Sequence, residues 1–284
     1  MKKVIFKIKR EILLATNKFG FDLIRLSENY INEEWHSPIE LLYKTNKPMV
    51  LVKVPIADIR FMAAHGFKAG KESNAPFITT IRKYANDGIK DYSESTLSHF
   101  YSSFQPKSVS EYLFLEKTEN NILNSLPASG MAYPWSNLEP LDRIRQRTLE
   151  IEIDNIEHKS KIRIDGGDSF YGPVSLEKGE LEYNRLINVY NSIKDNGFNV
   201  DIKGKNNIAA IVLESNGTYS YFINYGQHRV AALSNLDHEH IILQIQKGLI
   251  VRRSEVTFWP GVIKGYFTKS EALKVFDRIF TGRE

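Results

Sequence analysis

The chain has 284 residues, of which 42% are hydrophobic and 12% aromatic, enough for one large domain or two ordinary ones with substantial cores. It contains no cysteine, which excludes disulfides, thiolate catalysis and cysteine metal sites. There is no uncharged apolar run of the ~18 residues that a membrane span needs, and no signal-peptide pattern, so we expect a cytoplasmic protein.

The net charge of +4 is concentrated at the N-terminus, where residues 1–25 carry seven Lys or Arg against two acidic residues. The rest of the chain is close to neutral, so we expect no broad nucleic-acid-binding face and no DNA partner. Residues 1–20 predict a basic amphipathic helix. It could lie on an anionic membrane, giving peripheral contact with the inner membrane face, or its apolar stripe could dock on the protein's own body.

The first half of the chain reads as a mainly helical accessory region, 1–140. A short strand is predicted between Pro48 and Pro55, followed by a loop around His65. Helices are then predicted after a cap at Ser73 or Asn74, over residues 97–104 and after the capping residue Ser108. The proline-rich stretch 127–140 predicts a connection anchored by Trp135, and we place a domain boundary near its end.

The second half, 141–284, shows clearer periodicity. A helix through Ile193 stops at Gly197. Strands at 208–214 and 218–224 flank Asn216-Gly217, which strongly favours a hairpin. A helix after Gly226, a strand at 240–246 and a closing helix capped by Thr268 complete the order. The predicted fold class is therefore α+β.

The turn after the hairpin is the most informative stretch. Gly226-Gln227-His228-Arg229 leads from a strand into a helix, so free backbone N–H groups, the positive helix end and Arg229 would meet at one spot. That spot should attract phosphate. The alternative is an ordinary tight turn with a solvated arginine.

The same elements resemble the ParB/sulfiredoxin fold over residues 165–248. In that family a helix ending in an SI…G pattern, here 192–197, leads into a hairpin and then a G-x-x-R box, here 226–229, that holds nucleotide phosphates. The resemblance implies a C-terminal nucleotide-binding domain with a small mixed sheet and packed helices.

Two branches of that family do not suit this chain. Sulfiredoxins use a cysteine in the box, which is missing here, and ParB proteins need a downstream DNA-binding domain, for which the ~36 residues after Gly248 are too few. The G-x-H-R box is most similar to that of ParB-like small-molecule kinases, such as the free-serine kinases. The first half and residues 259–265 also loosely resemble proteins of bacterial surface-polysaccharide loci.

The resemblance implies roles for particular residues. The nucleotide, ATP or another, would bind at Gly226, Gln227, His228, Arg229 and Lys178. The catalytic group would be Glu180 or Glu182, at the start of the first helix of the fold, with His228 as a possible proton carrier. Alternatively, the two glutamates only complement the helix dipole, His228 only caps or packs, and Lys178 and Arg185 only pair with the glutamates.

The loop that contains Asp165 and Asp168 offers two carboxylates near the expected site. Mg²⁺ commonly takes one or two carboxylates together with substrate phosphates, so either residue could be its ligand; the alternative is a plain turn. The remaining histidines show no metal-ligand spacing.

These residues predict a Mg²⁺-dependent kinase that phosphorylates a hydroxyl of a small molecule or sugar, and the second resemblance implies a place in surface-polysaccharide biosynthesis. A nucleotide-binding switch or scaffold that transfers no phosphate is the alternative.

Overall fold

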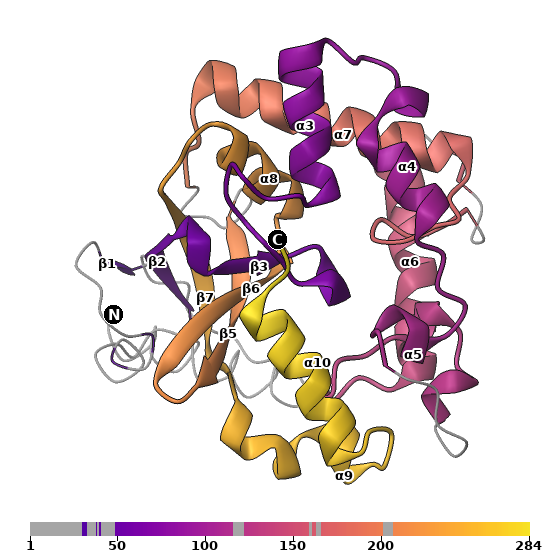
Figure 1. The fold of residues 1–284 in the computed structure, drawn as a ribbon, viewed down its shortest axis with the longest axis vertical. Helices are drawn as coiled ribbons and strands as arrows, with labels where there is room; N and C mark the ends of the chain where they lie inside the picture. The colour runs from indigo at the N-terminus through magenta and orange to yellow at the C-terminus, as the bar shows by residue number, and fades with distance from the viewer. Residues whose placement is uncertain are drawn as a thin grey trace, which may run out of the picture.

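The computed structural model describes residues 30–32, 38, 40, 49–115, 122–158, 161–162, 166–200 and 207–284 (Figure 1). The predicted helix of residues 1–20 and Asp165 lie outside the described residues, so the membrane and docking alternatives for that helix stay predictions. No helix of the described part is long and apolar enough to cross a membrane.

The centre of the fold is a mixed seven-stranded sheet. Its strands, in spatial order, are β1 (Tyr30–Asn32), β2 (Met49–Pro55), β7 (His240–Arg252), β5 (Ile208–Ser215), β6 (Thr218–Tyr225), β3 (Ile59–Phe61) and β4 (Phe67–Lys68). Three neighbouring pairs are parallel and three antiparallel. The predicted α+β class, the hairpin and the strand at 49–55 are confirmed. Strands on both sides of residue 140 belong to this one sheet.

In the part of the chain that the structure describes, helices lie at both ends of the sheet and along one side of it (Figure 1). They are α3 (Pro76–Asp87), α4 (Thr96–Ser103), α5 (Val109–Tyr112), α6 (Pro140–His158), α7 (Leu176–Asn196), α8 (Gln227–Asn235), α9 (Pro260–Ile263) and α10 (Lys269–Thr281). The predicted caps at Ser108 and Thr268 are confirmed. The predicted cap of α3 is wrong: Ala75 precedes the helix, whose first residue is Pro76, and Ser73 accepts a hydrogen bond from the Ala75 N–H instead.

Side chains of β6 point alternately to two hydrophobic cores. Tyr221 and Ile223 join the core that also contains buried residues of α3, α7 and α8, whereas Phe222 joins the core beneath α5 and α10. In Figure 1, α3, α7 and α8 lie near one end of the sheet and α9 and α10 near the other. Trp135 anchors the connection as predicted, because its ring packs edge-on against Trp259 at 5.6 Å.

His65 is buried in an aromatic cluster and gives a pH-dependent stability. It is 1% exposed, its ring lies 4.6 Å from that of Phe104, and Nε2 is 3.1 Å from the carbonyl of Phe170. Burial lowers the pKa of His65 from 6.5 to about 3. The folded protein therefore keeps this imidazole neutral down to pH about 3, whereas the unfolded chain protonates it below pH 6.5.

We therefore expect stability to fall as the pH drops from 6.5 toward 3, with His65 contributing a slope of at most ~1.4 kcal/mol per pH unit. His65→Phe keeps an aromatic ring in the cluster and removes the titrating group. Urea unfolding at several pH values should show a shallower dependence for the variant. Equal slopes for the two proteins would contradict this role.

Candidate functional site

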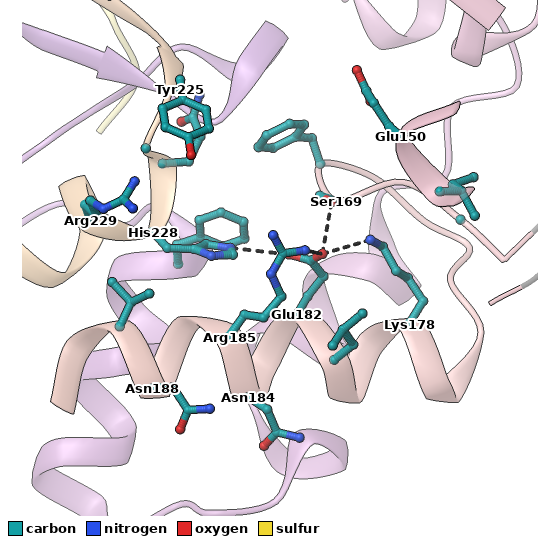
Figure 2. Close-up of a pocket in the computed structure, with 18 of the residues that line it drawn as sticks. Glu150, Ser169, Lys178, Glu182, Asn184, Arg185, Asn188, Tyr225, His228 and Arg229 are labelled. Atoms are coloured by element: carbon teal, nitrogen blue, oxygen red, sulfur yellow. Dashed lines mark hydrogen bonds and ion pairs between the residues drawn. The ribbon is translucent and has the colours of Figure 1, made fainter. Parts of the chain in front are cut away.

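A cavity of about 740 Å³ lies between α7, the start of α8, the loop 167–170 and α6. Figure 2 shows its polar side chains, which come from separate parts of the chain. Helix α7 contributes Lys178, Glu182 and Arg185, and α8 contributes His228 and Arg229. Phe77, Phe170 and Tyr225 add aromatic walls, and Asn184, Asn188 and Asn224 add amides. The volume lies in the range of pockets that hold cofactors.

Glu182 is the centre of a buried ionic network. The side chain is 1% exposed, and Oε1 accepts hydrogen bonds from Lys178 Nζ at 2.8 Å and from Arg185 at 3.2 Å. Ser169 Oγ donates to the same oxygen at 3.2 Å, and His228 Nε2 lies 3.3 Å from Oε2. The dashed lines of Figure 2 converge on this carboxylate. Residues three and four apart share one helix face, which brings the two α7 cations to Glu182.

This network keeps Glu182 ionised. Burial raises the pKa of the carboxyl, but the hydrogen bond with His228 and the charges of Lys178 and Arg185 outweigh burial and hold the pKa well below its usual value. A carboxylate with such a low pKa is a weak base at neutral pH. The network stabilises the fold above the unfolded pKa of Glu182, near 4.5, and this contribution is lost as the pH falls through the folded value.

The start of α8 presents unpaired backbone donors to the cavity. Val230 N–H donates to the carbonyl of Gly226 at 3.1 Å and is the first intrahelical bond. Within the described residues, the N–H groups of residues 227–229 have no hydrogen-bond partner, and Arg229 pairs with no carboxylate. The Arg229 guanidinium instead lies 5.7 Å from the ring centre of Tyr225. An anion placed here would meet a helix N-terminus and a cation together.

The side chain of Gln227 has a structural role. Its Nε2 donates to the carbonyl of Ile223 at 2.7 Å, and its Oε1 accepts from the Met62 N–H at 2.8 Å. These bonds fix the start of α8 against the end of β6 and the segment that follows β3. Gln227 was expected to bind the nucleotide. Its side chain is occupied by these two bonds, so only its backbone N–H is available to donate to a phosphate.

Gly226 is required at this turn for two reasons. Its φ is +91°, and an added Cβ would lie 3.1 Å from Ile208 Cγ1 and 3.2 Å from Ile208 Cα. Gly217, at φ +79°, has nothing within 4 Å of such a Cβ. Both substitutions to alanine cost the strain of positive φ, roughly 1–2 kcal/mol, but only Gly226→Ala also presses on β5.

We therefore expect Gly226→Ala to lower the free energy of unfolding by more than Gly217→Ala. Urea titration of the two variants measures the difference. Equal losses would show that the α8 start is not held against Ile208.

Asp168, one of the two residues predicted as a metal ligand, is paired with an arginine, and its role toward Mg²⁺ stays a prediction. It is 7% exposed, its Oδ2 is ion-paired with Arg147, and its Oδ1 accepts the Phe170 N–H at 2.8 Å. Burial lowers the pKa of Arg147, but the charges of Asp168 and Glu150 raise it by a larger amount, so the pKa lies above its usual value. No group of three His, Asp or Glu residues that could hold a metal ion occurs in the part of the chain that the structure describes. The carboxylate of Asp168 is neutralised by an arginine.

The structure brings together most of the predicted residues. Lys178, Glu182 and the Gly226–Arg229 turn all line the cavity. Glu180 does not: its side chain is exposed and is absent from the cavity wall. The sequence reasoning missed Arg147, Glu150 and the three asparagines. Asn184 and Asn188 stand four apart on α7 and could have been noticed, whereas no local pattern connects α6 to the turn.

Comparison with models of known protein families, with curated proteins and with solved structures finds no match. The resemblance to the ParB/sulfiredoxin fold therefore remains a prediction that rests on the order of elements and on the G-x-H-R turn.

Proposed function

We propose that the protein binds a nucleotide through its phosphates and transfers a phosphoryl group to a hydroxyl of a small molecule or sugar. The observation that carries this proposal is the charge of the cavity wall. Arg147, Lys178 and Arg185 of the cavity wall are ion-paired with Glu150, Asp168 or Glu182, whereas Arg229 pairs with no carboxylate in the described residues and lies beside the unpaired N–H groups of α8. Such a group of donors suits a polyphosphate.

The phosphates would bind at the start of α8. Arg229 has no carboxylate to compete for it in the described residues, and the three free N–H groups lie beside it. A guanidinium and a helix N-terminus neutralise phosphate charge and align the transferred group. Mg²⁺ would enter with the nucleotide, bound mainly to its phosphates.

The catalytic step needs a base for the acceptor hydroxyl. A neutral His228 that donates from Nε2 to Glu182 keeps Nδ1 as a proton acceptor. The acceptor oxygen would attack the terminal phosphorus of a nucleoside triphosphate and form a new P–O bond, while the bond to the bridging oxygen breaks and the nucleoside diphosphate leaves. The hydroxyl proton would pass to His228. Glu182 would hold the imidazole and stabilise its positive charge, as a buried carboxylate does in other His-based sites.

The alternative is a nucleotide-binding switch that transfers no phosphate. The low pKa of Glu182 favours it, since a carboxylate held by two cations and a histidine is a poor base by itself. Both readings need the nucleotide and differ only in the transfer step.

The test is calorimetric titration of the full chain with ATP, GTP, CTP and UTP in the presence of Mg²⁺, followed by phosphorus NMR for transfer to added alcohols. Binding with transfer supports the kinase, and binding without transfer supports the switch. The absence of binding by any nucleotide at millimolar concentration would overturn both.

A further inference from the structure

A second cavity, of about 230 Å³, adjoins the first. The two share four wall residues, Arg147, Phe170, Asn224 and Gln227. The remaining wall of the second cavity comes from the 3-10 turn Ala128–Gly130, the connection up to Leu138, Arg143 of α6 and the inner strands β5 and β6. The smaller cavity thus lies directly beside the place where phosphate is proposed to bind.

The arginines of the second cavity are ion-paired. Its wall contains Arg143, Arg147 and Asp168. Arg147 pairs with Asp168 and Glu150, and Arg143 pairs with Glu150 at 3.1 Å. Two guanidinium groups therefore face two carboxylates. In contrast to the first cavity, where Arg229 pairs with no carboxylate in the described residues, both arginines of this wall are ion-paired, so a neutral ligand fits it better.

The remaining wall is polar on one side and apolar on the other. Ser129 and Ser136 supply hydroxyls, and the hydroxyl of Ser136 accepts from the Leu138 N–H, which leaves its proton for a ligand. Phe222 and Tyr133 supply rings, and their centres lie 5.2 Å apart with the planes at 84°. Tyr133 is held by stacking on Trp135 at 5.1 Å. Hydroxyls together with fixed ring faces suit a molecule with many hydroxyls and apolar C–H faces.

The size limits the ligand further. Cavities that hold drug-sized ligands measure roughly 300–1,000 Å³, so one of about 230 Å³ takes a smaller molecule. We propose that the second cavity binds the phosphoryl acceptor, a neutral polyhydroxylated molecule about the size of a single sugar ring, with one hydroxyl at the shared wall. The role as acceptor rests on the proposed kinase function; the binding of a neutral polyol does not.

Substitutions that fill the second cavity with a larger side chain test the proposal. Ser129 lies in the wall and makes no hydrogen bond through its side chain in the described residues, so Ser129→Phe and the smaller Ser129→Leu should occupy the space. The matched control is Ser125→Phe, because Ser125 is exposed and lies outside the cavity. The probes are glucose and inositol as neutral polyols, with glucosamine and glucuronate as charged counterparts.

Saturation-transfer NMR should show binding of a neutral probe to the wild type and to Ser125→Phe, and at least a tenfold weaker affinity in both Ser129 variants. Calorimetric affinity for Mg²⁺-ATP should be the same in all of them. Binding of the charged probes only, or equal polyol affinity in a folded Ser129 variant, would overturn the second site. Polyol binding without nucleotide binding would instead reject the kinase function and leave the polyol site standing.

Discussion

Glu182→Gln is expected to lower turnover of phosphoryl transfer by ~10²–10⁴ while nucleotide affinity changes little, because Glu182 acts on His228 in the transition state and not on the phosphates. The same change removes a carboxylate that is 1% exposed from two cationic partners, Lys178 and Arg185, and from His228. Loss of one partner of a buried ion pair typically costs ~3–5 kcal/mol, so the free energy of unfolding should fall as well. Single-turnover kinetics and urea titration measure the two effects separately.

Glu180→Gln is the matched control. It is the same substitution on the same helix, two residues away, but the Glu180 side chain is exposed and lies outside the cavity. Its turnover and stability should equal those of the wild type. If Glu182→Gln kept full turnover in the folded state, the role of Glu182 in the His228 mechanism would be rejected; the switch alternative is supported only if the wild type binds a nucleotide and transfers no phosphate.

Arg229→Ala is expected to weaken nucleotide binding by roughly 10- to 150-fold, because a charge-assisted hydrogen bond to phosphate contributes ~1.5–3 kcal/mol. The fold should be unaffected: in the described residues Arg229 makes no ion pair and only stacks on Tyr225. Isothermal titration with Mg²⁺-ATP gives the affinity, and a thermal melt reports on folding.

Arg145→Ala serves as the control for charge alone. Arg145 is exposed on α6, pairs with Asp142 at 3.0 Å and is not part of the cavity wall. It also removes one positive charge from the protein, so a loss of affinity confined to Arg229→Ala identifies a specific contact. Unchanged affinity in a folded Arg229→Ala variant would show that phosphate does not bind at the start of α8.

Local patterns predicted the elements whose signals lie within a few residues. The hairpin is an example: Asn216 and Gly217 both have positive φ, as the turn type favoured by that dipeptide requires. The capping box at Thr268 and the stop at Gly197 are similar cases. The short strands β3 and β4 were missed because two or three residues carry no measurable period, and they form strands only by pairing with β6 and with each other.

The residues of the site also divide into those that local sequence patterns predict and those that only tertiary packing brings together. The α7 and α8 residues could be predicted because helical spacing and one turn bring them together. The ion pair between Arg147 and Asp168 could not, since it joins a helix to a loop 21 residues later and depends on tertiary packing. That pair gives Asp168 an arginine partner that the sequence did not predict. The structural role of the Gln227 side chain was equally hidden, because its partner Met62 lies 165 residues away.

The most direct test of the central claim is a crystal structure of the full chain with Mg²⁺ and a non-hydrolysable ATP analogue. We predict phosphates within hydrogen-bond distance of the backbone N–H groups of residues 227–229 and of the Arg229 guanidinium, with the terminal phosphate near the wall that the two cavities share. An analogue bound elsewhere on the protein, or an empty cavity at millimolar analogue in crystals whose packing leaves the cavity open, would contradict the claim.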